Sequence, residues 1–360
     1  MSTYDVIIVG AGPAGSTLGY ELARRGVSVL ILEKEKLPRN KTCAGGVTFR
    51  AHALIDFDIS SVTQRVVYGM KISYQLGDFC VKKYRDPIAH LVMRKDFDHL
   101  LVRKAQDAGA TVIDGLRADQ VSISHGKAEI ATKDGSFHAK IAVGADGANS
   151  MVASKMGLMK DAQRELALEA EVSVNQEHLD KMGHFINVDL GRIPGGYGWV
   201  FPKKNHVSAG VTGPARLSGN FKPYLDRILQ QFGEYDIIDF SGHVMPMRRR
   251  GSSIQRNNVL LVGDAAGLIH PLSGEGIFYA LKSAKLAAPV ILNALRADKG
   301  DLRDYQKAVD TELMPGLEIG RVLLKIYARC PRLCYSVIKR SDRFWSYGCR
   351  ALLGSSPAYA

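Results

Sequence analysis

Residues 4–15, Tyr-Asp-Val-Ile-Ile-Val-Gly-Ala-Gly-Pro-Ala-Gly, decide the fold of this chain. The first six form an almost continuous apolar run rich in β-branched side chains, which predicts a parallel strand buried on both faces. A helical pattern follows to Arg25 and stops at Gly26, a residue type that commonly ends helices. Residues 27–32 predict a second strand, which ends at Glu33. This order of strand, glycine-rich turn, helix, strand and acid predicts a βαβ unit that binds a dinucleotide.

Each part of that motif has a physical role. Gly10 permits a tight turn, Gly12 lets the backbone approach a pyrophosphate, and Gly15 lets the helix pack closely on the strand. The N-terminus of the helix attracts the phosphates, and Glu33 can accept a hydrogen bond from a ribose hydroxyl.

Two later segments suggest which dinucleotide is bound. An apolar run at residues 259–262 precedes Gly263-Asp264, and Gly274-Glu275-Gly276 opens a long helical pattern toward Leu295. The aspartate can hold a ribityl chain, and a helix N-terminus stabilises the negative charge of a reduced flavin ring. Between these regions, a predicted strand at residues 139–143 is followed by Asp146-Gly147.

The three spaced motifs resemble those of the FAD-dependent monooxygenase and reductase superfamily related to para-hydroxybenzoate hydroxylase, over about residues 1–300. The resemblance implies FAD as cofactor, with Asp264 on the ribityl hydroxyls and Asp146-Gly147 near the flavin and nicotinamide regions. It also implies an α/β fold of mixed α+β character, with a Rossmann-type FAD-binding domain, an interleaved antiparallel β-sheet substrate domain and a C-terminal helical region. We expect the FAD-binding domain at residues 1–65, 90–160 and 250–300, the substrate domain at 66–89 and 161–249, and the basic helical region at 301–360.

Two further segments narrow the family. Lys-Thr-Cys-Ala-Gly-Gly at residues 41–46 and Gly-Gly-Tyr-Gly-Trp-Val-Phe-Pro at residues 195–202 resemble segments of the geranylgeranyl reductase family, which saturates double bonds of polyprenyl chains. In that family the first segment lies beside the flavin, an arginine at the position of Arg94 contacts the cofactor, and the backbone at Ala118 meets the adenine. The cofactor-binding residues that the motifs and the resemblance imply are Gly10, Gly12, Pro13, Ala14, Gly15, Glu33, Lys34, Cys43, Ala44, Gly46, Arg94, Ala118, Asp146, Gly147, Asp264, Gly274, Gly276 and Ile277.

The implied chemistry restricts the substrate pocket. A reduced flavin delivers hydride to one alkene carbon while a proton reaches the other, so the protein binds, orients and excludes water. Because an alkene offers no polar handle, the pocket should be long and apolar. Strand patterns between residues 165 and 213 predict a sheet that could cover the flavin and form this pocket. Cys43 is either a proton donor or a small buried hydrophobe. Tyr197 and Trp199 share one face of a predicted strand, where they either contact substrate or pack in the core.

The chain carries a formal net charge of +12, which predicts an anionic partner. Residues 321–350 account for +7 of it, and residues 1–320 for +5. Arg321, Lys325 and Arg329 form one helical stripe beside an apolar face. This pattern is typical of a membrane-surface helix, and equally of a solvated helix that closes the substrate domain. No nucleic-acid recognition motif is present, so we expect no nucleic-acid partner.

The remaining features set the expected class and compartment. Five cysteines are scattered without a Cys-x-x-Cys pair, which argues against a metal site. The first ten residues lack the pattern of a secretory signal, and no apolar run is long enough for a membrane span. We therefore expect a cytoplasmic protein, either free or peripheral on the cytoplasmic membrane face. The sequence leaves the oligomeric state open.

The function expected first is FAD-dependent reduction of a polyprenyl lipid, with NAD(P)H or a reduced ferredoxin-type carrier as electron donor. Two alternatives stay open on the same fold: an FAD-dependent monooxygenase, such as a hydroxylase or halogenase, and a non-enzymatic, lipid-associated flavoprotein. Halogenases of this fold carry Trp-x-Trp-x-Ile-Pro, whereas residues 197 and 201 here are Tyr and Phe, which disfavours that version.

Overall fold

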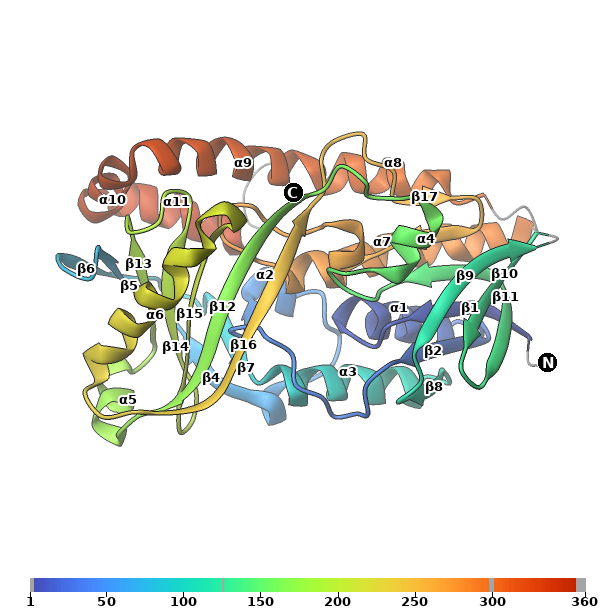
Figure 1. Cartoon of the computed structure of the whole chain (residues 1–360), viewed down its shortest axis with the longest axis horizontal. Helices are drawn as coiled ribbons and strands as arrows, with labels where there is room; N and C mark the ends of the chain where they lie inside the picture. The colour runs from blue at the N-terminus through green and yellow to red at the C-terminus, as the bar shows by residue number, and fades with distance from the viewer. Residues whose placement is uncertain (1–2, 125, 298–300, 354–360) are drawn as a thin grey trace. The chain divides into compact units, whose positions relative to one another are not determined.

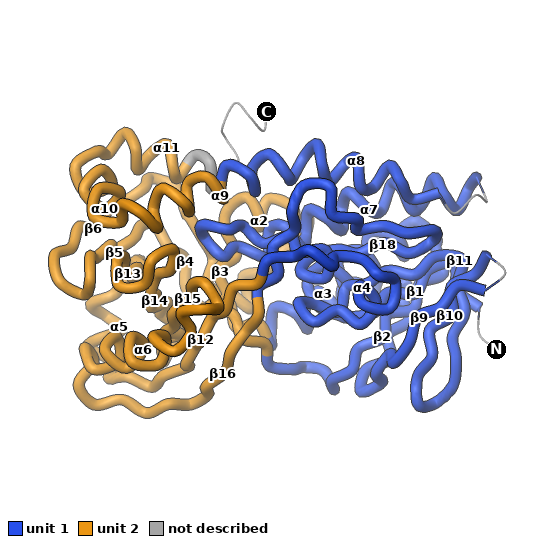
Figure 2. The backbone as a smooth tube through the Cα atoms, turned by 45° about the horizontal axis from the view of Figure 1, so that its top comes forward, with its two compact units in different colours: residues 1–40, 95–163, 245–319 blue, residues 41–94, 164–244, 320–360 orange. Residues whose placement is uncertain are grey.

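The structure is a computed structural model that describes residues 3–124, 126–297 and 301–353. The chain separates into two compact units, coloured in Figure 2. Unit 1 comprises Met1–Asn40, Lys95–Gln163 and Met245–Ile319, and unit 2 comprises Lys41–Arg94, Arg164–Val244 and Gly320–Ala360. Each unit is therefore assembled from three separate stretches of sequence.

Unit 1 is built on a mainly parallel sheet in the order β17-β18-β11-β1-β2-β8 (Figure 1). The antiparallel hairpin β9–β10 continues it from β11. Its strands are β1 (Thr3–Val9), β2 (Val29–Glu33), β8 (Thr111–Asp114), β9 (Ala118–Ser124), β10 (Lys127–Thr132), β11 (Gly135–Gly144), β17 (Gln255–Arg256) and β18 (Val259–Leu261). Its helices are α1 (Pro13–Ala23), α3 (Arg94–Asp107), α4 (Met151–Met156), η4 (Gly263–Ala266), α7 (Ile277–Ala297), α8 (Arg303–Glu312) and the start of α9 (Met314–Arg329).

The core of unit 1 follows from the apolar runs in the sequence. Val6, Ile7 and Ile8 of β1 are fully buried, because the strand is paired on both sides and covered on both faces. Helix α1 packs on β2 and α7. The predicted strands at residues 4–9, 27–32 and 259–262 are confirmed within one or two residues, and the strand predicted at 139–143 is the end of β11, which begins four residues earlier at Gly135.

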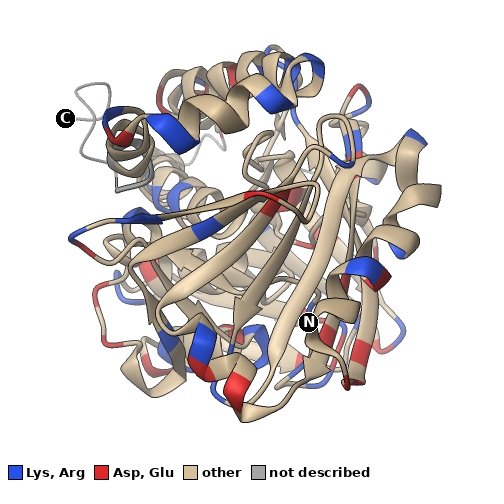
Figure 3. Cartoon of the chain, turned by 90° about the vertical axis from the view of Figure 1, so that its left-hand side faces the viewer, with Lys and Arg blue, Asp and Glu red and all other residues tan. Residues whose placement is uncertain are grey.

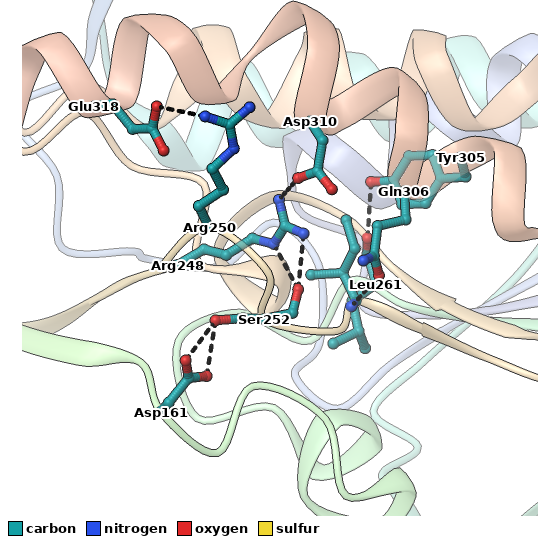
Figure 4. Close-up of polar contacts among 10 residues, drawn as sticks. Asp161, Arg248, Arg250, Ser252, Leu261, Tyr305, Gln306, Asp310 and Glu318 are labelled. Carbon is teal, nitrogen blue, oxygen red and sulfur yellow. Dashed lines mark hydrogen bonds and ion pairs between the residues drawn. The ribbon is translucent and has the colours of Figure 1, made fainter.

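A buried arginine fixes the loop before β17. Arg248 is fully buried, and its guanidinium bonds the Asp310 carboxylate at 2.5 Å and the Ser252 carbonyl at 2.7 and 3.0 Å (Figure 4). The Tyr305 hydroxyl, from α8, donates to the Leu261 carbonyl at 2.8 Å. These bonds hold the end of β18, which leads into the Gly263-Asp264 turn.

Unit 2 contains two sheets. The larger has the order β16-β12-β15-β14-β13-β5-β6, and the smaller has the order β3-β7-β4. Their strands are β3 (Gly46–Thr48), β4 (Thr63–Val67), β5 (Gly69–Tyr74), β6 (Phe79–Lys83), β7 (Ala89–Val92), β12 (Gln163–Ser173), β13 (Phe185–Leu190), β14 (Tyr197–Pro202), β15 (Val207–Pro214) and β16 (Asp236–Met247). The helices are α2 (Phe49–His52), α5 (Gln176–Met182), α6 (Phe221–Leu229), α10 (Pro331–Arg340) and α11 (Asp342–Leu353), with the short turns η1 (Ser60–Val62), η2 (Ala215–Asn220) and η3 (Gln230–Phe232).

The sequence led us to expect an antiparallel sheet in the substrate domain. The larger sheet of unit 2 is instead mixed. β13 and β5 pair in parallel, because β5 comes from the separate 41–94 stretch and enters the sheet beside β13. One face of this sheet is covered by α5 and α6, whose apolar side chains pack on Val200, Ala209 and Val211.

The units also group some residues differently from the expected domain borders. Residues 41–65 belong to unit 2, because β3 and β4 both pair with β7. Residues 320–353 join the same unit: the Tyr327 hydroxyl donates to the Gly196 carbonyl at 2.7 Å, and the Trp345 indole donates to the Lys83 carbonyl at 2.8 Å. No helix in the described ranges is long and apolar enough to cross a bilayer.

Candidate functional site

In the glycine-rich turn after β1 in unit 1, the backbone at Gly12 has free space beside it, whereas Gly10 and Gly15 are crowded. Gly10 has φ +107°, and a Cβ placed on it would lie 2.3 Å from the Ala145 carbonyl oxygen. A Cβ on Gly15 would lie 1.9 Å from the Gly10 carbonyl oxygen. A Cβ on Gly12 would meet only the Arg39 side chain, at 3.7 Å. Gly12 is the N-cap of α1 and has no side-chain cap, so accessible backbone meets the positive end of a helix, the arrangement that binds phosphates.

Glu33 closes this turn and holds an arginine over it. The Ala11 N–H donates to the Glu33 carboxylate at 3.0 Å, and the Arg39 Nε lies 3.4 Å from it. Arg39 also donates to the Asp98 carboxylate at 3.0 Å. The guanidinium therefore stands next to Gly12, where it would compensate the charge of a diphosphate.

Arg39 and Asp98 were missed by sequence reasoning. A signal existed for Asp98, since it stands beside Phe97 on the apolar face of α3, where a lone acid needs a partner. The Leu116 N–H donates to the Glu33 carbonyl at 2.9 Å, which brings the segment before Ala118 beside the acid. Lys34 is exposed, and Arg94 is the first residue of α3.

The two later glycine motifs meet at one place in unit 1. A Cβ on Gly276 would lie 3.5 Å from an Asp264 carboxylate oxygen, and a Cβ on Gly263 would lie 3.0 Å from the Ala14 Cβ. Gly274 has φ +67°, and Ile277 begins α7. The Asp264 turn, the start of α7 and the start of α1 thus lie together, as one flavin site would require.

The Asp146 carboxylate is engaged in hydrogen bonds with residues that follow it closely in the sequence. Its carboxylate accepts hydrogen bonds from the Ser150 hydroxyl at 2.5 Å and from the Met151 and Val152 N–H groups at 2.7 and 3.1 Å, at the start of α4. Burial raises the pKa of Asp146. Gly147 has φ +77° and nothing within 4 Å of an added Cβ. The implied cofactor role of this pair stays a prediction.

In unit 2 the loop that carries Cys43 is held by two buried charged side chains. The Cys43 N–H donates to the Glu169 carboxylate at 3.0 Å. The Lys203 ammonium donates to the Ala44 and Val92 carbonyls at 2.7 and 3.0 Å, and the lysine is fully buried. Gly45 has φ +68°, and its added Cβ would lie 1.9 Å from the Val92 oxygen, so only glycine fits there.

Strand register places aromatic and acidic side chains on one face of the larger sheet. Tyr197, Trp199 and Phe201 of β14 lie opposite residues 212, 210 and 208 of β15. Glu169 and Glu171 of β12 lie opposite residues 210 and 208. All these positions therefore share the face that α5 and α6 do not cover.

Trp199 carries an unused donor on this face. A Cβ on Gly210 would lie 2.1 Å from the Trp199 ring, so the indole lies over Gly210. Trp199 is 7% exposed, and its buried indole N–H has no hydrogen-bond acceptor among the described residues. A buried donor without an acceptor is costly, so this N–H is available to a bound ligand.

Burial shifts the titration of the acids on this face. It raises the pKa of Glu165 to about 7. Burial first, and the Glu171 charge second, raise the pKa of Glu169 to about 7, against the Cys43 N–H and the Lys203 ammonium, which lower it. Burial lowers the pKa of Lys203 and raises that of Tyr197. The alternating glutamates of β12 were the sequence signal for these acids, and sequence reasoning did not use it.

The residues of unit 1 fit FAD, on the grounds of the open Gly12 peptide, the adjacent Arg39 and the meeting of Asp264 with Gly276. A family model described as "FAD binding domain" matches residues 3–310.

Among curated proteins, digeranylgeranylglycerophospholipid reductase 1 of Methanopyrus kandleri is 30% identical over 338 residues, covering 88% of this chain and 89% of the relative. A solved geranylgeranyl bacteriochlorophyll reductase-like protein from Thermoplasma acidophilum is 25% identical with a TM-score of 0.82, covering 98% of this chain and 92% of the other. A flavin-dependent brominase, 21% identical with a TM-score of 0.78 over 100% of this chain and 95% of its own, shares the fold.

Proposed function

The chain belongs to the geranylgeranyl reductase family of proteins with an FAD-binding domain, and on that premise we propose that it saturates carbon–carbon double bonds of a polyprenyl lipid. The observation that carries the proposal is the set of side chains on the face of the larger sheet in unit 2 that lies opposite α5 and α6. There Trp199 and Phe201 contribute apolar side chains, while the Cys43 loop is fixed beside a buried acid, Glu169. Apolar aromatic side chains suit an alkene chain, which offers no polar handle.

Individual residues would have separate tasks in this reaction. When bound, FAD would accept two electrons from NAD(P)H or a reduced ferredoxin-type carrier and supply a hydride to one alkene carbon. Gly12 and Arg39 would hold the diphosphate, and Glu33 the ribose. The Cys43 thiol would give a proton to the second alkene carbon. Trp199 would pack against the chain.

An anaerobic incubation tests this proposal. The purified yellow protein is reduced with dithionite, mixed with geranylgeranyl lipids and analysed by mass spectrometry. We expect the product to gain two hydrogens for each saturated bond. Incorporation of oxygen or bromine in the aerobic reaction, with no saturated product under anaerobic conditions, would instead assign the alternative chemistry of the same fold. The Gly15→Ala variant is the control without bound cofactor.

We also propose that the C-terminal helices dock on an anionic membrane surface, where such a substrate resides. Apolar side chains stand exposed along α9–α11, namely Ile319, Val322, Leu323, Ile326, Leu333, Val337, Phe344 and Tyr347. Lysine and arginine alternate with them, and Figure 3 shows these cations along the helices of this region. An amphipathic basic surface of this kind binds lipid headgroups and inserts its apolar side.

Vesicle flotation tests the docking. We expect the chain to float with anionic but not with zwitterionic vesicles. Each of Lys325→Gln and Arg329→Gln should weaken binding about fivefold, since one cation near an anionic surface contributes ~1 kcal/mol. Val322→Ser/Ile326→Ser should abolish flotation, whereas the matched exposed pair Ile237→Ser/Ile238→Ser on β16 should not. Equal flotation of the two double variants would refute the docking.

A further inference from the structure

Three titratable side chains behind the Cys43 loop have no assigned task in the proposed reaction. A thiol that gives its proton to carbon must regain one before the next turnover. We propose that Glu169 reprotonates Cys43 and is itself recharged from the surface through Glu171 and His206. This inference rests on the proposed function, because it assigns the proton source of that reaction.

The first step of the path starts from a contact between Glu169 and the backbone of Cys43. The Glu169 carboxylate accepts the N–H of Cys43 itself at 3.0 Å, so the acid is held at the residue it would serve. Glu169 is only 4% exposed, and its proton cannot be exchanged freely with bulk water. To give up a proton in every turnover, Glu169 needs a neighbouring protein side chain that returns a proton to it.

The second step follows the strand outward. Glu171 stands two residues beyond Glu169 on β12, so both carboxylates point to the same face, with Cα atoms about 7 Å apart. The His206 Nε2 lies 3.0 Å from a Glu171 carboxylate oxygen, and the two side chains are 12% and 15% exposed. The exposed fraction of the side chains thus falls from the His206–Glu171 pair to Glu169. A proton path from solvent to a buried acid requires such a decrease.

Lys203 keeps the path electrically balanced. This buried ammonium interacts with Glu171, Glu169 and Cys43, and each of the three favours its charged form against the effect of burial. One fixed positive charge therefore compensates a negative charge at whichever of the three sites has lost its proton. The charged groups around Glu169 are Glu171 on its own strand and Lys203 after β14, and Cys43 on the loop donates its backbone N–H to the carboxylate.

The proposed transfers balance. One alkene carbon receives a hydride and the other receives the thiol proton, which leaves an alkane and the Cys43 thiolate. The Glu169 carboxylic acid then gives its proton to the sulfur and becomes a carboxylate. Glu171 passes a proton to Glu169, and protonated His206 passes one to Glu171 and takes another from water. No electrons move in these last steps.

Single and multiple turnovers separate the path from the chemistry. In Glu169→Gln, with FAD bound, we expect the first turnover within about twofold of the wild-type rate, because in the proposed path the first proton comes from the Cys43 thiol itself. Later turnovers should fall about 100-fold, the usual size of a lost general acid. Glu177→Gln, an exposed glutamate of α5, is the matched control and should keep the wild-type rate in both regimes.

A second variant guards against a folding defect in the first. His206→Ala, at a position whose side chain is 12% exposed, should also slow only the later turnovers, and added imidazole should restore them. The pH dependence of Cys43 alkylation is an independent readout, which should lose an inflection near pH 7 in Glu169→Gln. Unchanged steady-state rates, an absent imidazole effect or an unchanged alkylation profile would each overturn the path. If the wild type reduces no polyprenyl lipid, the proposed function fails, while the alkylation profile still decides whether Glu169 controls Cys43.

Discussion

Replacing Lys203 by methionine tests how the Cys43 loop is held. The substitution keeps most of the side-chain length but removes the ammonium that donates to the Ala44 and Val92 carbonyls at 2.7 and 3.0 Å. A charge-assisted hydrogen bond contributes about 1.5–3 kcal/mol, and removing one partner of a buried charge cluster costs about 3–5 kcal/mol. Because methionine no longer has a charge to desolvate, we expect a net loss of about 3 kcal/mol at neutral pH.

The loss should depend on pH. At pH 5 Glu169 is protonated, since its pKa is about 7, and the variant lacks only the two hydrogen bonds. At pH 8 the carboxylate forms without its cation, so the penalty grows. The two tryptophans of the chain, Trp199 and Trp345, both lie in unit 2, and their fluorescence during urea unfolding reports on that unit.

The comparison is made at pH 5 and pH 8 with equal FAD saturation. Lys181→Met, which removes an exposed lysine from α5, is the control and should leave the unfolding free energy unchanged. A loss below about 1 kcal/mol at both pH values would refute the role given to the lysine. A loss that is equal at both would refute its electrostatic coupling to Glu169.

Three other outcomes are expected. Gly15→Ala should abolish FAD binding, measured by absorbance of the purified protein, because its Cβ would lie 1.9 Å from the Gly10 carbonyl oxygen. Gly210→Ala should displace the Trp199 indole, shift its fluorescence and raise KM for the lipid more than it lowers kcat, because its Cβ would lie 2.1 Å from the ring. In the wild type, Glu169 binds more protons when folded than when unfolded between pH 4.5 and 7. Its stability contribution is therefore complete below pH 4.5 and falls by about 3 kcal/mol as pH rises through 7, a slope that Glu169→Gln should remove in urea titrations.

The C-terminal helix shows where sequence patterning stops being sufficient. The spacing of Arg321, Lys325 and Arg329 beside Val322 and Ile326 predicts an amphipathic helix, and α9 confirms it. An apolar stripe is compatible with packing and with exposure alike. Only the fold shows that Val322 and Ile326 are 57% and 49% exposed while Tyr327 is buried and donates to the Gly196 carbonyl.

The turn from β1 to α1 was determined by the sequence alone. Its constraints are local, since Gly15 makes its close approach to Gly10 five residues earlier, and the apolar run before them predicts a buried strand. Neighbouring residues and fixed turn geometry suffice to predict such a motif, and Glu33 follows at the end of the next strand for the same reason.

The side-chain contacts around the Cys43 loop were determined by the tertiary structure. Glu169 meets Cys43 across 126 positions, and Lys203 meets Ala44 across 159. No local pattern encodes these pairings, because they depend on which strands are neighbours in the sheet and on the register between them. A shift of one residue would turn Glu169 and Trp199 to the opposite face. The sequence therefore determined which cofactor the chain is built to hold, and the packing of distant strands decided which acids, aromatics and cations surround its cysteine.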